Sequence, residues 1–192
     1  MTDVVIKGAT YNASDPYYNR TCPAVLGQNF AAGTEDGRGL SWFTEGNLKA
    51  NLLFEAIGAV VKETPDWVKQ CQNTNKVPLL AVGLMEPVPW VPLVLPVQVV
   101  KIGQFAIAVT SFEVTTMAGR RIRSTVKSAL AGAGVTEVEL ASISNAYIQY
   151  MTTKEEYLTQ NYEGASTVFG PNQLAAVQQE LTRVAASVAD TS

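Results

Sequence analysis

Four tyrosines are concentrated in the stretch NAYIQYMTTKEEYLTQNYEGAST, residues 145–167: Tyr147, Tyr150, Tyr157 and Tyr162. Tyrosines so close together fill a core, face lipid, or aim their hydroxyls at one point. Tyr150 stands just past a predicted strand and Tyr162 just past a short predicted helix, so their phenols could converge. A pair of tyrosines is nevertheless more often packed core with one satisfied hydroxyl.

Glu113 lies where an apolar strand stops and a turn toward a helix begins. Carboxylates at strand ends often serve catalysis or metal binding, because a rigid element aims them into a cleft. The alternative is a salt bridge to Arg120 or Arg121, and position alone favours that salt bridge. Ser166 and Thr167 are discounted as nucleophiles, because the chain has no histidine to act as their base.

The composition predicts a globular, soluble chain. Its 192 residues are 47% hydrophobic and 16% charged, enough for one substantial domain. The net charge of −3 shows no basic footprint, so nucleic acid is not expected as a partner. The longest apolar run, VPWVPLVLPVQVV, is interrupted by prolines and is too short to span a membrane. Without histidine, the chain lacks the commonest general base and the commonest zinc ligand.

The cysteines Cys22 and Cys71 are either two buried thiols or one disulfide. Each lies in a loop rich in Pro, Asn or Gln, which favours the disulfide and an oxidising compartment. No signal peptide is visible in this chain. Sequons for glycosylation begin at Asn12 and Asn19, and they matter only in a eukaryotic secretory pathway.

The predicted helices and strands follow one another in a mixed order along the chain. This order predicts an α+β fold and not strict βαβ alternation. Apolar periodicity predicts helices over 44–62, over 118–131 and from Pro171 onward. Thr153, with Glu156 three residues later, predicts a short capped helix. β-rich runs predict strands at 77–85 and 135–144 and a hairpin over 97–110 that turns at Gly103-Gln104.

Several long, ordered motifs carry a resemblance to a known family: RTCPAVLGQNFAAGTEDG, SFEVTTMAGRRIR, SNAYIQYMTTKEEYLTQNYEGASTVFGP and QLAAVQQEL. They resemble the neutral/alkaline ceramidases, amidohydrolases that cleave ceramide to sphingosine and a fatty acid. The resemblance covers residues 20–184. It implies mixed and antiparallel β-sheets packed in layers with outer helices, as part of a larger catalytic domain.

The resemblance also assigns site residues. In the family a zinc ion is held by two histidines from the earlier half of the catalytic domain and by a glutamate and a tyrosine from the later half. The glutamate maps to Glu113, in FEVTTMAGRR, and the tyrosine maps to Tyr150, just before TTKEEY. A second tyrosine, in NYEG, positions or polarises the scissile amide carbonyl and maps to Tyr162.

The remaining residues take structural roles in this interpretation. The family places a disulfide where Cys22 and Cys71 fall, and Tyr147 and Tyr157 are then expected to be packing residues. Three parts of the family have no counterpart in this chain. They are its histidine ligands, its GDVSPN-type segment bearing the serine nucleophile, and its C-terminal immunoglobulin-like domain. We therefore expect residues 1–192 to be the C-terminal portion of a ceramidase catalytic domain, supplying half of a zinc site.

The resemblance implies ceramide or a related sphingolipid as substrate and the remaining half of the catalytic domain, covalently joined or separate, as partner. It implies a secreted, extracellular or periplasmic protein with peripheral membrane contact. Segment 87–95 either borders a lipid-accepting mouth or forms a buried connection. The alternative function is a non-catalytic truncated paralogue that binds lipid or a protein partner.

Overall fold

The computed structural model describes residues 1–8 and 15–189, so the sequon at Asn12 lies outside the described residues. The elements are, in chain order, β1 (Leu26–Gly27), η1 (Gln28–Ala32), α1 (Leu52–Lys62), α2 (Asp66–Cys71), β2 (Pro78–Leu80), η2 (Val82–Leu84), β3 (Gln98–Ile102), β4 (Phe105–Val109), β5 (Glu113–Val114), α3 (Thr116–Ala129), η3 (Ala131–Ala133), β6 (Glu137–Ala141), β7 (Tyr150–Met151), α4 (Lys154–Thr159), α5 (Tyr162–Ser166) and α6 (Gln173–Ala189). This mixture confirms the predicted α+β class.

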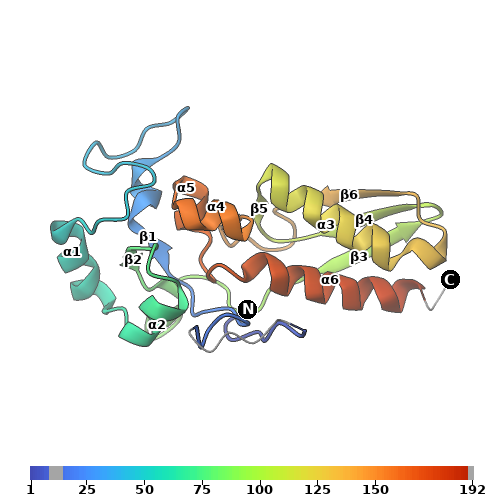
Figure 1. Ribbon diagram of the computed structural model, residues 1–192, viewed down its shortest axis with the longest axis horizontal. Helices are drawn as coiled ribbons and strands as arrows, with labels where there is room; N and C mark the ends of the chain where they lie inside the picture. The colour runs from blue at the N-terminus through green and yellow to red at the C-terminus, as the bar shows by residue number, and fades with distance from the viewer. Residues whose placement is uncertain (9–14, 190–192) are drawn as a thin grey trace.

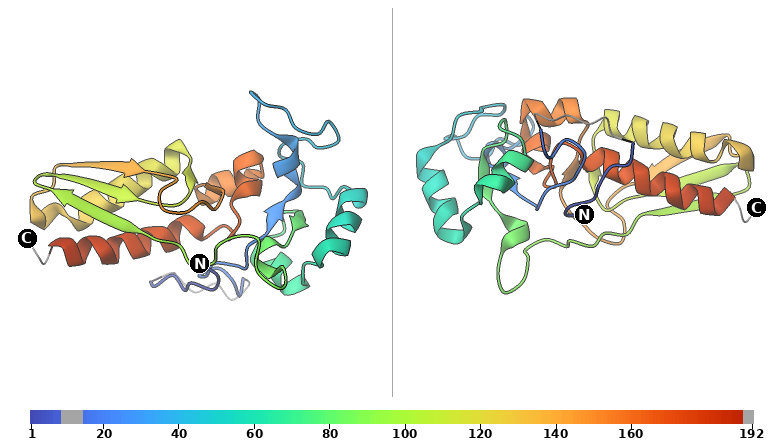
Figure 2. Two further views of the ribbon diagram at one scale, coloured as in Figure 1. Left: turned by 180° about the vertical axis from the view of Figure 1, so that it is seen from behind. Right: turned by 60° about the horizontal axis from the view of Figure 1, so that its bottom comes forward.

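The molecule is elongated, and its three-stranded sheet lies at one end (Figure 1). There β3 pairs antiparallel with β4, and β4 pairs parallel with β6. The three views agree that α3 and α6 lie side by side on one face of this mixed sheet (Figures 1 and 2). Alternation along the strands turns Val99, Ala106 and Val138 toward the helices, where they join Ile122 and Leu181 in the core.

The opposite end contains α1, α2 and the antiparallel pair β1–β2 (Figure 1). The Cys22–Cys71 disulfide ties the segment before β1 to the end of α2, with the two Cα atoms 5.7 Å apart. This confirms the predicted disulfide. Between the two ends lie α4, α5 and the parallel pair β5–β7 (Figure 1). None of the described helices combines the length and the apolar character needed to cross a bilayer.

The helix predicted over 44–62 begins later than expected, at Leu52. Residues 44–51 instead form a loop, because Gly46 has a left-handed φ of 70° and the backbone carbonyls of Asn47 and Lys49 accept hydrogen bonds from Gln28. Most of the apolar side chains of α1 are exposed, and only Gly58 is buried. The sequence therefore predicted the apolar side chains of this helix correctly. The described residues leave most of these side chains exposed.

Segment 87–95 is a surface connection whose side chains divide into two sets. Val88, Trp90 and Val94 are exposed, while Val91 and Leu93 pack against the core. The prediction of a buried connection is therefore wrong for its exposed half. Predicted strand 77–85 is shorter than expected, because only Pro78–Leu80 pairs, with β1, before the chain turns into η2.

A buried lysine joins the middle group to the disulfide end. The Lys76 ammonium donates to the carbonyl oxygens of Val25 at 3.1 Å and Thr167 at 2.8 Å, and lies 5.0 Å from the centre of the Tyr157 ring. Tyr157 is fully buried, and its hydroxyl donates to the Gln72 side-chain oxygen at 2.8 Å. This confirms that Tyr157 is a packing residue.

Replacing this lysine with an apolar side chain of similar length tests the network. Lys76→Met is expected to lower the free energy of unfolding of the complete protein by about 2 kcal/mol, because two buried carbonyls lose their donor. Burial lowers the pKa of Lys76 in the folded state, so between that lowered value and about 10.4 the unfolded chain binds more protons. Stability of the natural protein should therefore rise with pH across this window, and Lys76→Met should lose that rise.

Urea unfolding at several pH values measures both effects. The matched control is Lys69→Met, which removes a half-exposed lysine paired with Asp66 and should change stability by less than about 0.5 kcal/mol. Equal stability curves for Lys76→Met and the natural protein would show that the buried network contributes nothing.

Candidate functional site

Glu113 and Tyr150 are neighbours across the parallel pair β5–β7. The register places Glu113 opposite Tyr150 and Val114 opposite Met151. The Glu113 amide donates to the Gln149 carbonyl at 2.9 Å, and the Thr115 amide donates to the Met151 carbonyl at 3.1 Å. Residues opposite one another in a ladder project to the same face. The structure thus brings together the two side chains that were predicted to be metal ligands.

Glu113 has a further partner that was not predicted. The Tyr147 hydroxyl donates a short hydrogen bond to Glu113 Oε1. Tyr147 is 46% exposed, so the expectation that it is a packing residue is wrong. The predicted salt bridge to an arginine is also wrong, because Arg121 pairs with Glu155 at 2.9 Å and Arg120 lies against the sulfur of Met117.

Tyr162 completes an aromatic group at the same place. Its ring stacks on Phe30 with 5.7 Å between centroids and meets the Tyr150 ring edge-on at 5.6 Å. Its backbone amide donates to Glu45 Oε1 at 3.1 Å. The rings of Tyr150 and Tyr162 are therefore in contact, with Tyr150 in β7 and Tyr162 at the start of α5.

The turn between α4 and α5 positions Tyr162. The Thr153 hydroxyl accepts from the Glu156 amide while the Glu156 carboxylate accepts from the Thr153 amide, which confirms the predicted capping box. Gln160 ends α4 in a left-handed conformation, with φ of 51°. A Cβ on Gly164 would lie 3.0 Å from the Glu156 carbonyl oxygen, so glycine allows α5 to pack closely on α4.

Ser166 and Thr167 have structural roles. The Ser166 hydroxyl donates to the Tyr162 carbonyl at 2.7 Å, and the Thr167 hydroxyl donates to the Glu163 carbonyl at 2.9 Å. Both hydroxyls thus bond the backbone one helical turn earlier, and both side chains are buried. This agrees with discounting them as nucleophiles.

The phenols of the site are held in the protonated form by their surroundings. Partial burial, and then the hydrogen bond and negative charge of Glu113, raise the pKa of Tyr150 to about 12. Burial is also the main cause that raises the pKa of Tyr147 and of Tyr162. At neutral pH these three side chains are therefore neutral donors, whereas a divalent cation would favour the phenolate of any tyrosine that ligates it.

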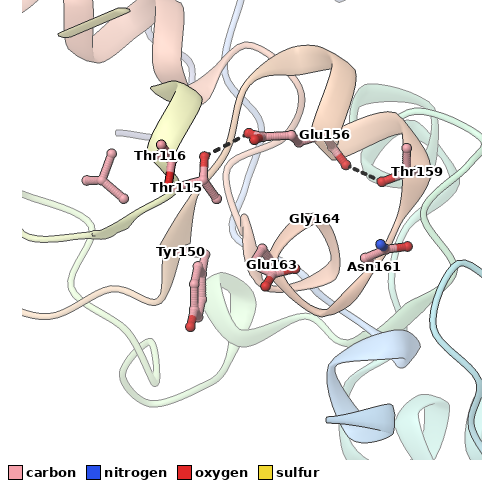
Figure 3. A pocket seen from close by; sticks show the side chains of 9 residues that line it. Thr115, Thr116, Tyr150, Glu156, Thr159, Asn161, Glu163 and Gly164 are labelled. Atoms are coloured by element: carbon pink, nitrogen blue, oxygen red, sulfur yellow. Dashed lines mark hydrogen bonds between the residues drawn. The ribbon is translucent and has the colours of Figure 1, made fainter. Parts of the chain in front are cut away.

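Two hollows meet at Tyr150, and Glu113 lines neither of them. One, of about 430 Å³, is lined by residues that include Thr115, Tyr150, Glu156 and Glu163, and Figure 3 shows Tyr150 and Glu163 next to one another, with Thr115 hydrogen-bonded to Glu156. The other, of about 530 Å³, shares Tyr150 and Glu163 and adds the carboxylate of Glu45. Tyr150 thus lies where a molecule in either hollow would reach it.

The donor set suits part of a zinc site. Zinc in proteins takes four ligands and accepts carboxylate oxygen, and Glu113 and Tyr150 offer two oxygen ligands side by side. Within residues 1–8 and 15–189, no group of three or more His, Cys, Asp or Glu side chains is arranged to hold a metal ion. Glu113 and Tyr150 alone are fewer donors than the four ligands that zinc takes in such a site.

Comparisons with known proteins point to one family. The model of the family described as "Neutral/alkaline non-lysosomal ceramidase, N-terminal" matches residues 1–179. Neutral ceramidase B of Dictyostelium discoideum is 42% identical over 187 residues, which cover 92% of this chain and 26% of that protein. Neutral ceramidase of Oryza sativa subsp. japonica is 42% identical over 172 residues, covering 86% of this chain and 22% of that protein.

Solved structures agree with these matches. A ceramidase described as complexed with C2 has a TM-score of 0.75 and 39% identity, covering 90% of this chain and 27% of that chain. Neutral ceramidase from Pseudomonas aeruginosa has a TM-score of 0.71 and 34% identity, covering 90% of this chain and 25% of that one. The chain thus spans about a quarter of the length of the relatives it matches. It belongs to the neutral/alkaline non-lysosomal ceramidase family.

Proposed function

We propose that residues 1–192 form the later portion of a ceramidase catalytic domain, and that the complete protein hydrolyses the amide bond of ceramide to sphingosine and a fatty acid. The observation that carries this proposal is the pairing of Glu113 with Tyr150 across β5–β7, with Tyr162 against the Tyr150 ring. The relatives named above are ceramidases, which supports the choice of reaction and substrate.

In this proposal Glu113 and Tyr150 hold a zinc ion together with two ligands from the remainder of the protein. When bound, zinc supplies Lewis acidity and lowers the pKa of a coordinated water from 15.7 to about 7. The protonated Tyr162 would donate a hydrogen bond to the amide carbonyl, whose oxygen gains negative charge when a nucleophile adds to the carbonyl carbon. Its stacking on Phe30 keeps the ring in place for that contact.

We also propose that the protein acts in an oxidising compartment, secreted, extracellular or periplasmic, because disulfides persist there. Exposed apolar side chains at Val88, Trp90 and Val94 would give segment 87–95 peripheral contact with a membrane or border a lipid-accepting mouth. The second candidate function is a non-catalytic module that binds lipid or a protein partner. The exposed apolar face of α1 favours it, since such a face suits a binding partner.

Tyr162→Phe in the complete protein tests the proposed reaction. The variant keeps the ring that stacks on Phe30 and removes only the hydroxyl. Loss of one such donor typically costs about 100- to 1,000-fold in kcat, so we expect that loss with little change in KM. The measurement is the rate of fatty acid release from ceramide in mixed micelles.

The matched control is Tyr17→Phe, because Tyr17 lies in a hollow with Arg20 and Trp67, outside the candidate site. An unchanged kcat for Tyr162→Phe would remove Tyr162 from the reaction. A complete natural protein that binds ceramide but releases no fatty acid would favour the non-catalytic module.

A further inference from the structure

The half-exposed Tyr147 side chain has one close partner of functional interest. Its hydroxyl donates to Glu113 Oε1 and lies 3.5 Å from the side-chain oxygen of Gln149. A carboxylate has two oxygens, and each accepts more than one hydrogen bond or ligates a cation. A donor fixed on Oε1 therefore limits the rotation of the Glu113 carboxylate and leaves Oε2 for another partner.

The backbone holds the Tyr147 hydroxyl in this place from both sides. On one side the Ile148 amide donates to the Ser111 carbonyl at 3.1 Å, and the Ile148 side chain is buried in the core. On the other side the Glu113 amide donates to the Gln149 carbonyl. The residues that follow Tyr147 are thus hydrogen-bonded to the segment that carries Glu113. These backbone bonds fix the positions of Tyr147 and Glu113 relative to one another.

The conformation around Tyr147 is also unusual for its residue types. Asn145 and Gln149 both have left-handed backbones, with φ of 63° and 57°. Residues other than glycine rarely adopt this region, and such conformations persist where the surrounding contacts impose them. Tyr147 lies between these two left-handed residues, and its hydroxyl contacts Glu113 of β5.

The arginines Arg121 and Arg123 of α3 pair with carboxylates other than Glu113. Arg121 pairs with Glu155 and Arg123 pairs with Glu139, both on the exposed side of α3. A neutral phenol differs from an arginine at this position, because it orients the carboxylate without cancelling its negative charge. The full charge of Glu113 then remains available to a cation.

We propose that Tyr147 is a positioning residue for the candidate zinc site, holding one oxygen of Glu113 so that the other faces the metal. This inference rests on the proposed function, in which Glu113 is a zinc ligand. Metal-ligating carboxylates are commonly hydrogen-bonded by such outer partners, and their loss typically costs about 10- to 100-fold in metal affinity.

The test is a chelator competition that measures the zinc Kd of the complete protein, of three single variants and of one double variant. Tyr147→Phe keeps the ring and removes the hydroxyl, and it should raise the zinc Kd by about 10- to 100-fold. Glu113→Gln should raise it further, and the control Tyr17→Phe should leave it unchanged. In the Glu113→Gln background, Tyr147→Phe should have no additional effect, because the carboxylate ligand that Tyr147 would orient is already lost.

The outcomes separate the two proposals. A normal zinc Kd for Glu113→Gln overturns the proposed zinc site, and the role of Tyr147 with it. A raised Kd for Glu113→Gln together with a normal Kd for Tyr147→Phe overturns only the positioning role. A raised zinc Kd for Tyr147→Phe could also follow from a general loss of stability, which thermal unfolding measures. If Tyr147→Phe lowers the unfolding midpoint of the zinc-free protein as much as that of the zinc-loaded protein, Tyr147 is a structural residue and the inference is wrong.

Discussion

Glu113→Gln in the complete protein is expected to raise the zinc Kd by more than about 100-fold and to abolish ceramide hydrolysis. The expectation exceeds the 10- to 100-fold loss typical of outer partners, because the substitution removes the charge of a proposed ligand itself. The amide keeps nearly the same shape and still accepts a hydrogen bond from Tyr147. Elemental analysis of the purified protein after dialysis gives the zinc content, and a fatty acid release assay gives the activity.

The control for this substitution is Glu155→Gln. Glu155 is exposed and pairs with Arg121 on the outside of the molecule, so its loss should leave zinc content and activity unchanged. Full zinc content in Glu113→Gln would exclude Glu113 as a ligand. Equal losses in both variants would point to a general effect of charge and not to ligation.

Removing the disulfide with Cys22→Ala and Cys71→Ala together is expected to destabilise the complete protein by about 4 kcal/mol. The two cysteines are 49 residues apart in the sequence, and in the chain-entropy model a closed loop of this length stabilises by about that amount. Both cysteines are buried, so the alanine substitutions also remove packing contacts of the sulfur atoms. Urea unfolding of the double variant under oxidising conditions measures the change.

The natural protein in reducing buffer provides the comparison for this experiment. It should unfold at a similar urea concentration to the double variant, because both lack the cross-link. A loss of less than about 1 kcal/mol in the double variant would contradict the chain-entropy estimate, and would show that the remaining contacts restrain the two segments.

Elements with local signals were predictable from the sequence. The hairpin turn at Gly103-Gln104 was placed correctly because glycine supplies the left-handed φ of 60° that the turn needs. The helix after Thr153 was placed correctly because its capping box consists of neighbouring residues. In both cases the stabilising interactions lie within a few residues of one another.

Elements that depend on distant contacts were predicted less well. Residues 44–51 have a helical pattern, yet they form a loop because Gln28 and Asn29, far earlier in the chain, take the backbone carbonyls of Asn47 and Lys49. The exposure of α1 has the same origin. Its apolar pattern predicts burial, but burial depends on what else packs there, and the described residues leave this face open.

The candidate site follows the same division. Glu113 and Tyr150 were proposed through resemblance to a family, and the position of Glu113 alone favoured a salt bridge. Their adjacency depends on a parallel strand pair formed between distant segments. Tyr147 was taken for a packing residue because nothing near it in the sequence marks its hydrogen bond to Glu113. Its left-handed neighbour Asn145 was the one local signal, since asparagine tolerates that conformation.

The central claim is that Glu113 and Tyr150 are two ligands of one zinc ion, and a crystal of the complete protein measured at the zinc absorption edge tests it directly. We predict one anomalous peak at about 2.0–2.2 Å from a Glu113 carboxylate oxygen, in contact with the Tyr150 phenol oxygen as well. A zinc peak bound elsewhere, with Glu113 and Tyr150 contacting only protein or water, would contradict the claim.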